Sequence, residues 1–377
     1  MPTDVPTQTI ANVPLLDLRR QYAGIREEIR NAIDEIADQQ ALVLGKVTAE
    51  FESDLADYCD CTHAIGCSSG TDALIMAMMA IDIQPGDEVI LPSFTFFATA
   101  GCVHRMGAVP VFADIDPRTF NLDPADIEHR ITPKTRAIVP VHLFGQCADM
   151  DAINRIACSH DLLVLEDAAQ AIGATRNGRP ACSMGWMGAL SFYPTKNLGA
   201  FGDAGAVLCR DDALADRLRK LRVHGSGHTY YHDEVGGNFR IDALQSAVLK
   251  VKLQYLEKWH DARRANAAYY DERFAEVEQI VTPFIDAGNK SIYNQYVVRV
   301  KDRDAVKEKL GEHGVGSGIY YPLGLHLQKC FGYRGGKVGD LPHTESAQAE
   351  VLALPVYPEL TEPERERVAD VLIDVVD

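Results

Sequence analysis

A lysine and an acidic residue stand where this chain could carry out carbonyl chemistry. Lys196 lies in the run Ser191-Phe-Tyr-Pro-Thr-Lys196, and Asp167 ends the apolar run Leu163-Val-Leu-Glu-Asp167. An amine can form an imine with an aldehyde, and a carboxylate can keep a pyridine nitrogen protonated. Pyridoxal phosphate (PLP) chemistry requires both groups from a protein. We therefore expect an amino-group enzyme if the fold brings Lys196 and Asp167 together.

A third motif predicts a phosphate site. The run Ser68-Ser-Gly70-Thr71-Asp72 lies where an apolar run ends and a helical pattern begins. The free N–H groups of a helix N-terminus bind phosphate oxygens, and Gly70 allows close approach of the backbone. The hydroxyl groups of Ser69 and Thr71 are further candidate donors. The residue types are explained equally well if Thr71 is only the helix N-cap.

Each chemical interpretation has a structural alternative. Asp167 at a strand end would also serve as a helix cap or an ion-pair partner, and Lys196 in a loop rich in glycine would be a solvated charge. Desolvation and a nearby cation would instead lower the pKa of Lys196 and leave a free amine. Gln170, three residues after Asp167, is placed to reach the ring hydroxyl of a bound cofactor.

The elements that must position these residues form an α/β pattern. Between about residues 60 and 210, short β-rich runs alternate with helical stretches, which indicates a mostly parallel sheet covered on both faces. The expected strands are 64–67, 88–91, 109–113, 137–141 and 162–165, and the expected helices are 72–80, 98–106, 124–130 and 150–158. Asp167 then lies at the carboxyl end of a strand, where α/β folds place ligands.

The rest of the chain predicts the loop that carries Lys196 and a second domain. Apolar runs at 189–192 and 206–209 flank the lysine segment, and a helix over 242–277, a strand at 293–300 and a helix at 304–313 follow. A chain of 377 residues exceeds one usual core. We predict a large α/β domain over 1–260 and a small C-terminal α+β domain over 261–377. An amphipathic helix at 20–39 is expected to pack on its own domain, or else across a subunit interface.

Composition argues against several classes of function. The chain has 37 Lys+Arg and 54 Asp+Glu, a net charge of −17, so we expect no binding to nucleic acid or anionic membranes. With no signal peptide pattern and no apolar run long enough to span a bilayer, a cytoplasmic protein is expected. The nine cysteines follow no framework and are expected to be free thiols. We expect no metal site, because the glycines before His228 and His232 favour a loop over a helical His pair.

The motifs together resemble the DegT/DnrJ/EryC1/StrS family of PLP-dependent nucleotide-sugar aminotransferases. They span nearly the whole chain in family order: Gly70-Thr-Asp-Ala-Leu74, Pro92-Ser-Phe-Thr-Phe96, Glu166-Asp-Ala-Ala-Gln170, Ser191-Phe-Tyr-Pro-Thr-Lys196, Gly236-Gly-Asn-Phe-Arg240, and Tyr321-Pro322 with His326. The combination is specific, whereas no single motif would be. The resemblance implies the type I PLP-dependent transferase fold of aspartate aminotransferase, with a large mixed, mostly parallel sheet.

The resemblance also implies a role for each matched residue. Lys196 would bind the cofactor as an imine and move a proton between donor and cofactor. Asp167 would pair with the pyridinium nitrogen, and Gln170 would bond the ring hydroxyl. The further cofactor residues would be Gly70, Thr71 and Ser191 at the phosphate, Phe96 stacked on the ring, and Asn238 from a neighbouring subunit. The substrate-binding residues would be Arg240, His326 and Tyr321. A homodimer with shared active sites follows.

The implied reaction moves an amino group from L-glutamate to a keto nucleotide sugar. Segments 225–232 and 144–149 are most similar to members that act on 3-keto sugars linked to UDP or TDP. A 4-keto sugar, a cyclitol, or a non-catalytic PLP-binding regulator of the same fold are the alternatives. Members that dehydrate carry histidine at the lysine position, so Lys196 favours amino transfer.

Several residues bear on the acceptor. His142 is a candidate pocket donor, and Arg222 or Lys250 could offer charge to a diphosphate besides Arg240. Two positions depart from the family pattern: Tyr320 stands where many relatives have histidine, and Gly324 stands where proline is common. Both are expected near the sugar pocket, so the acceptor stays open.

Overall fold

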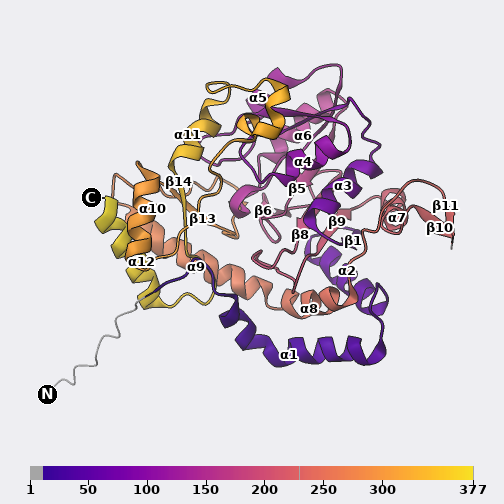
Figure 1. Ribbon diagram of the computed structural model, residues 1–377, viewed down its shortest axis with the longest axis horizontal. Helices are drawn as coiled ribbons and strands as arrows, with labels where there is room; N and C mark the ends of the chain where they lie inside the picture. Colours follow the sequence, from indigo (N-terminus) through magenta and orange to yellow (C-terminus); the bar gives the residue numbers. More distant parts are fainter. Residues whose placement is uncertain (1–11, 229, 377) are drawn as a thin grey trace.

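The computed structural model describes residues 12–228 and 230–376, and a seven-stranded sheet forms its centre (Figure 1). The strand order is β1-β9-β8-β5-β4-β2-β3, and only β9 runs antiparallel to its neighbours. The strands are β1 (His63–Cys67), β2 (Glu88–Pro92), β3 (Val109–Ala113), β4 (Thr135–Ile138), β5 (Leu163–Asp167), β8 (Met187–Ser191) and β9 (Gly205–Cys209). The predicted mostly parallel α/β sheet is confirmed.

Helices cover both faces of this sheet, because hydrophobic side chains leave each strand alternately on either side. On β2, Ile90 joins the core under α2 and α6, whereas Val89 and Leu91 join the core under α3, α4 and α7. The bounds of the helices around the sheet are α2 (Lys46–Tyr58), α3 (Gly70–Ala80), α4 (Ala98–Arg105), α5 (Pro124–Arg130), α6 (Met150–Ser159) and α7 (Asp212–Leu221). The alternating strand and helix pattern of the sequence thus builds a three-layer structure.

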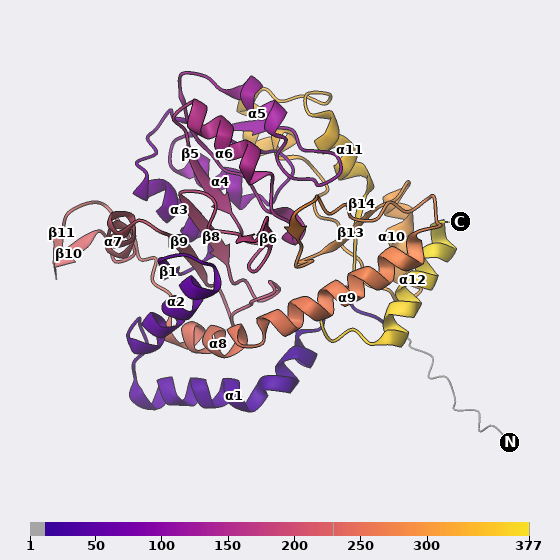
Figure 2. The same ribbon diagram turned by 180° about the vertical axis from the view of Figure 1, so that it is seen from behind.

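The predicted N-terminal amphipathic helix is confirmed and packs on its own chain. It is α1 (Leu18–Gln39), which lies along α8 (Ala243–Leu253) in both views (Figures 1 and 2). Its Ile25, Ile29 and Ile36 are buried. The side chains of one helical face therefore fix α1 against α8.

The long helical stretch predicted over roughly 242–277 consists of two helices, because the chain breaks between α8 and α9 (Leu256–Phe274) at Gln254 and Tyr255. Neither glycine nor proline marks this break, so no local signal predicts it. Packing accounts for it: α8 lies on α1 and α2, whereas α9 runs away from the sheet toward a second core (Figure 2).

The second core lies around the far end of α9. Leu256 of α9 still belongs to the core under α2 and α6, whereas Tyr270 and Phe274 belong to the second core. The other elements of the C-terminal part are α10 (Arg303–Glu312), α11 (Pro342–Glu350), α12 (Glu362–Val376) and the antiparallel pair β13 (Tyr296–Arg299) and β14 (Val351–Leu354). We retain the predicted division near residue 260 as a proposal; α9 is continuous across it.

Shorter elements complete the described chain. They are the strands β6 (Thr175–Arg176), β7 (Arg179–Pro180), β10 (Ser226–His228), β11 (Tyr231–His232) and β12 (Asn289–Lys290), and the 3₁₀ turns η1 (Leu143–Gly145), η2 (Leu325–Leu327) and η3 (Lys329–Arg334). The β10–β11 pair projects from the body beside α7 (Figures 1 and 2). All nine cysteines are free thiols, as predicted. Within residues 12–228 and 230–376, no helix is long and apolar enough to span a membrane.

Candidate active site

The carboxyl ends of the parallel strands meet at one edge of the sheet, and the predicted cofactor residues gather there. In the strand register, Gly205 of β9 lies between Cys67 of β1 and Ser191 of β8. A cavity of about 660 Å³ opens at this edge. The predicted site residues that line it are Gly70, Thr71, Phe96, Asp167, Gln170, Ser191, Lys196 and Tyr321. The fold therefore brings Lys196 and Asp167 into one cavity.

The start of α3 forms one wall of the cavity. Ser69 is the N-cap, because its Oγ accepts a hydrogen bond of 3.0 Å from the backbone N–H of Asp72. The alternative in which Thr71 is the N-cap is wrong: Thr71 lies in the first turn of α3 and its side chain is exposed beside the cavity. The first turn of α3 consequently presents backbone N–H groups and the Thr71 hydroxyl, a set of donors suited to a phosphate.

Two glycines let the three strand ends approach this helix. A Cβ atom on Gly70 would lie 2.6 Å from the Cβ of Ser191, and a Cβ atom on Gly205 would lie 2.4 Å from the carbonyl oxygen of Ser69. Neither distance is possible for real side chains, so both positions require glycine. The close approach places Ser191 directly against the first turn of α3.

Asp167 is a buried carboxylate that lines the cavity. Its side chain accepts hydrogen bonds from Thr99 Oγ1 (2.7 Å) and from the backbone N–H of Ala169 (3.2 Å). Burial raises the pKa of Asp167, while the bond from Thr99 opposes that shift. A cation beside this carboxylate would relieve the cost of burying its charge. The protonated pyridine nitrogen of PLP fits that requirement.

Glu166, the residue before Asp167, points to the other face of the sheet. Its carboxylate accepts hydrogen bonds from His142 Nε2 and from the backbone N–H groups of Cys182, Met184 and Gly185. His142 Nδ1 accepts a bond from the backbone N–H of Ala148, so the ring proton is on Nε2. The prediction of His142 as a pocket donor is wrong, because its ring is fully buried behind β5 and does not line the cavity.

Lys196 lies in the loop between β8 and β9 and lines the same cavity. Burial lowers the pKa of Lys196 to about 8, and the charge of Asp167 opposes this shift. The loop is held by the bond from the Lys196 backbone N–H to Tyr193 O (2.8 Å) and by buried Lys252, whose Nζ donates to Gly199 O (2.5 Å). At neutral to mildly alkaline pH, a substantial fraction of Lys196 is therefore the free amine that attacks an aldehyde.

Gln170 is held from two sides. Its Nε2 donates to the hydroxyl of Tyr321 (2.9 Å), and its Oε1 accepts from the backbone N–H of Phe144 (2.9 Å). The ring of Tyr321 lies 6.3 Å from that of Phe96, which is 57% exposed at the cavity. The bond from Gln170 to the ring hydroxyl of the cofactor stays a prediction, as does the stacking of Phe96 on the cofactor ring.

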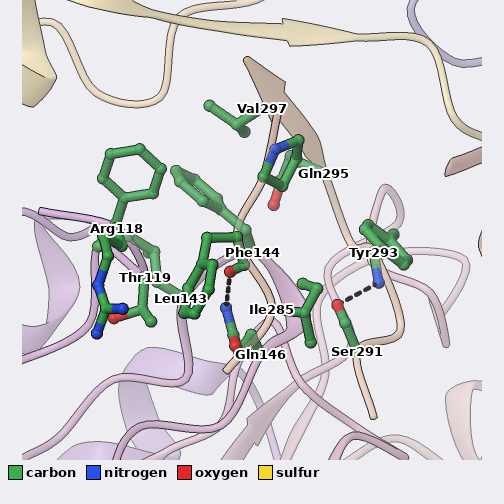
Figure 3. Close-up of a pocket in the computed structure, with 13 residues that line it drawn as sticks. Arg118, Thr119, Leu143, Phe144, Gln146, Ile285, Ser291, Tyr293, Gln295 and Val297 are labelled. Carbon is green, nitrogen blue, oxygen red and sulfur yellow. Dashed lines mark hydrogen bonds between the residues drawn. The ribbon is translucent and has the colours of Figure 1, made fainter. Parts of the chain in front are cut away.

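Phe144 in turn lies against a much smaller cavity of about 20 Å³, room for roughly one water (Figure 3). Figure 3 shows the hydrogen bonds that close it, from the Gln146 backbone N–H to Leu143 O and from the Tyr293 backbone N–H to Ser291 Oγ. Gln295 lines both this small cavity and the large one. Such a volume cannot hold a substrate, so we regard the region as support for Phe144 and Gln170.

Three predicted residues do not line the cavity. Asn238 is exposed, and Arg240 is half-buried with its backbone paired to Cys67. The prediction of His326 as a substrate ligand requires correction. Its ring is buried, with Nδ1 2.7 Å from Ser93 Oγ and Nε2 3.3 Å from Glu345 Oε1. The ring nitrogens of His326 are thus used within the chain.

The two other candidate diphosphate ligands are also engaged elsewhere. Arg222 is buried, pairs with Glu52 and donates to Gly66 O at 3.0 Å. Lys250 pairs with Glu50. Both basic side chains therefore stabilise the packing of α2 and do not extend into the cavity.

The departures from the family pattern have separate outcomes. Tyr320 lines the cavity, as expected. Gly324 does not, and its small size is required elsewhere: a Cβ atom there would lie 2.7 Å from Thr344 Cγ2. Of these two departures, only Tyr320 is therefore placed to contact the acceptor directly.

Sequence reasoning missed part of the cavity wall. Ser69, a candidate phosphate donor from the sequence, does line it, and the additional lining residues are Leu74, Thr95, Ala98, Val141, Ala169, Tyr193, Thr195, Asp203, Ala204 and Gln295. Tyr193 and Thr195 are neighbours of Lys196 and could have been named from that proximity. Gln295 belongs to the C-terminal part of the chain, and no motif connects it with the site.

Comparison with known proteins agrees with this geometry. A model of the DegT/DnrJ/EryC1/StrS aminotransferase family matches residues 23–373. A protein of Geobacillus stearothermophilus named "Pleiotropic regulatory protein" is 47% identical, over 95% of this chain and 97% of its own. A UDP-N-acetyl-3-dehydro-alpha-D-glucosamine 3-aminotransferase of Acidithiobacillus ferrooxidans is 43% identical, over 97% and 98%. A dTDP-3-amino-3,4,6-trideoxy-alpha-D-glucose transaminase of Streptomyces venezuelae is 41% identical, over 95% and 94%.

Solved structures of similar sequence share the fold of this chain. The crystal structure of S. venezuelae DesV in complex with a ketimine intermediate is 40% identical, covers 97% of this chain and 99% of its own, and has a TM-score of 0.95. NtdA from Bacillus subtilis with bound cofactor PMP is 34% identical, covers 98% and 86%, and has a TM-score of 0.92. The fold predicted from the sequence is therefore confirmed.

Proposed function

This chain belongs to the DegT/DnrJ/EryC1/StrS aminotransferase family, and on that premise we propose that it moves an amino group from L-glutamate to a keto nucleotide sugar, with PLP as cofactor. The aminotransferase class and the PLP cofactor expected from the sequence agree with the family and with the PMP-bound relative. One observation carries the proposal for this chain: Lys196, whose pKa is lowered to about 8, shares a cavity with the buried carboxylate of Asp167.

The residues present fit PLP. The first turn of α3, with Thr71 and the closely packed Ser191, would hold the phosphate, and Gly70 leaves room for it. Phe96 would cover the ring face, and Asp167 would keep the ring nitrogen protonated. Bound PLP supplies an aldehyde for an amine and an electron-withdrawing ring. The glycine at position 70 and the buried carboxyl group of Asp167 each match one end of that molecule.

The protein side chains would perform the proton transfers. As a free amine, Lys196 Nζ would remove the proton from Cα of L-glutamate. Asp167 would hold the proton on the ring nitrogen and so keep the ring electron-withdrawing. For the acceptor half of the reaction Lys196 would act in the opposite direction and deliver a proton to the sugar carbon. Both halves would therefore depend on the same lysine in the same cavity.

We further propose a 3-keto sugar linked to UDP or TDP as the acceptor. Relatives with 43% and 41% identity are named for 3-amino transfer on a UDP-linked and a dTDP-linked sugar. A cavity of about 660 Å³ is of the size that holds small-molecule ligands. Tyr320, the departure from the family pattern, lines that cavity and is the side chain most suited to distinguish this acceptor from a 4-keto sugar or a cyclitol.

A homodimer with shared active sites is part of the proposal. Asn238 is exposed and does not line the cavity of its own chain. The nearby β10–β11 projection carries Tyr231, 74% exposed, and Val235, 88% exposed, follows it (Figure 1). Apolar side chains this exposed favour a partner surface. A second copy of the chain would cover them and receive Asn238 at its own phosphate site.

The alternative of a non-catalytic regulator is supported by the name of the Geobacillus stearothermophilus relative. Against it, a regulator that only binds PLP has no need of an amine with a lowered pKa beside Asp167. The two functions differ in a measurable way. The enzyme must convert its cofactor when an amino donor is added, whereas a regulator leaves the cofactor unchanged.

The test follows the absorbance of protein reconstituted with PLP. L-Glutamate should remove the absorbance of the lysine-bound cofactor, and keto UDP- or TDP-sugars should restore it with formation of an amino sugar detected by mass spectrometry. Lys196→Ala is the control and should show neither change while still binding cofactor. No absorbance change with L-glutamate or any other amino donor would sink the proposal and favour the regulator.

A further inference from the structure

A second cavity lies beside the candidate active site and contains a buried positive charge. It has a volume of about 320 Å³. Thr195, Gln295 and Tyr320 line both this cavity and the large one. Thr195 precedes Lys196 in the chain, so the second cavity adjoins the segment that carries the amine.

The charge is the guanidinium of Arg263 on α9, which lines the second cavity and is only 5% exposed. Its Nη1 donates to the backbone oxygens of Tyr293 (3.0 Å), which is labelled in Figure 3, and Asn294 (3.4 Å). Its Nε is buried without a hydrogen-bond partner. Among the described residues, no carboxylate forms an ion pair with Arg263, and Glu359 acts on it only through longer-range charge.

The same cavity holds a second polar group without a partner. The hydroxyl of Tyr357 is buried and forms no hydrogen bond with the described protein. Burial lowers the pKa of Arg263 to about 10, which expresses the cost of keeping this charge away from water. A buried charge without a counter-ion and a buried hydroxyl without an acceptor are both costly, and one acidic ligand in this cavity would supply both.

We propose that this cavity binds the side-chain carboxylate of the amino donor, with Arg263 as its cationic partner and Tyr357 as a second donor. The inference rests on the proposed function, since it concerns the donor of that reaction. The α-carboxylate is attached to the reacting carbon and must stay in the large cavity. A carboxylate separated from that carbon by methylene groups can extend into the second cavity, whose walls include Leu354 and Val356.

The site accounts for a preference between donors. L-Glutamine has the length of L-glutamate but ends in a neutral amide, which can accept a hydrogen bond from a guanidinium but offers it no opposite charge. Arg263 should therefore favour L-glutamate over L-glutamine. If Arg263 only held the backbone of Tyr293 and Asn294 or balanced Glu359, its loss would affect both donors equally.

The experiment measures the rate of cofactor conversion by each donor in holoenzyme and in the Arg263→Gln variant. The ratio of kcat/KM for L-glutamate over L-glutamine should fall about 10- to 100-fold, as expected for loss of hydrogen bonds to a charged group. The control is Arg264→Gln, the next residue on α9, which pairs with Asp261 and does not line the cavity. Its ratio should be unchanged.

A binding measurement gives a readout that does not require turnover. Glutarate, which has no amino group, should bind the holoenzyme in calorimetry, and Arg263→Gln should lose that binding. Tyr357→Phe removes only a hydroxyl and should weaken glutarate binding about 5-fold while the fold is kept, which guards against a variant that fails to fold.

The outcomes separate the two proposals. If neither donor converts the cofactor in the unmodified protein, the proposed function fails. If L-glutamate converts it but Arg263→Gln leaves the donor ratio and glutarate binding unchanged, the carboxylate site is overturned and the function stands.

Discussion

His142 donates a 2.8 Å hydrogen bond to the carboxylate of Glu166, and both side chains are fully buried. Because side chains alternate along a strand, this bond anchors β5 from one face while Asp167 enters the cavity from the other. Two adjacent acids thus have separate tasks. Glu166 holds β5 in place, and Asp167 lines the cavity.

The first prediction compares these adjacent acids. Glu166→Gln should lower the free energy of unfolding by about 2–3 kcal/mol, because the carboxylate accepts charge-assisted bonds that an amide cannot reproduce. Its cofactor absorbance should be nearly unchanged. Asp167→Asn should not lower the free energy of unfolding in this way, but the rate of cofactor conversion should fall at least about 100-fold. Denaturant unfolding and single-turnover absorbance on both variants check this, and equal effects of the two would contradict it.

The second prediction concerns the pH dependence of stability without cofactor. Burial raises the pKa of Asp167, so the folded protein retains a proton over a pH range in which the unfolded chain has released it. The stability of cofactor-free protein should therefore fall as pH rises through that range. Asp167→Asn removes this loss and should be the more stable form at neutral pH. Unfolding curves at several pH values measure it; a less stable Asn variant at neutral pH counts against the assignment.

The third prediction concerns the amine. The pKa of Lys196 is lowered to about 8, so its protonated fraction dominates below that pH. The rate at which cofactor-free protein captures PLP covalently should rise about tenfold per pH unit below pH 8 and level off above it. Rapid-mixing absorbance measures the rate, with Lys196→Ala as the blank. A rise that continues to pH 10 would mean an ordinary, solvated lysine.

The fourth prediction tests the glycine cradle. Gly70→Ala places a Cβ atom within 2.6 Å of Ser191, so the first turn of α3 must move and PLP affinity should fall more than tenfold. Gly311→Ala is a matched control, because it lies in α10 with nothing within 4 Å of the added atom. Fluorescence titration with PLP gives both affinities. Unchanged affinity in Gly70→Ala would remove α3 from the phosphate site.

The fifth prediction tests the shared active sites. Homodimers of Lys196→Ala and of Asn238→Ala should each have low activity. A mixed dimer contains one site with both residues intact if Asn238 comes from the partner. Equal mixing after reversible dissociation should restore up to about a quarter of the unmodified activity.

The matched control for that experiment is Lys196→Ala mixed with Asp167→Asn. These two residues line the cavity of one chain. Mixed dimers therefore have no intact site, and no activity should return. If the Asn238 mixture also stays inactive, each chain uses its own Asn238 or none.

Much of the fold follows from local patterns. The period-2 and period-3.6 repeats of apolar residues predict the strands and helices of the sheet, and strand β3 and helix α5 agree with their predicted bounds. The helical stretch predicted over 242–277 missed the break at Gln254, because packing of α8 on α1 and α2 ends the first helix with no glycine or proline present.

Residue types and their order along the chain were enough to predict the chemistry of this protein. An amine, an acid at a strand end and a helix start with a glycine are properties of residue types, and the order of the motifs determined the family. Which residues share a cavity depends on the three-dimensional fold. It placed His142 and His326 in buried hydrogen bonds and brought Gln295 and Arg263 beside the lysine loop from the C-terminal half. The reason is physical: burial and hydrogen-bond partners come from contacts between distant segments, and no local spacing encodes them.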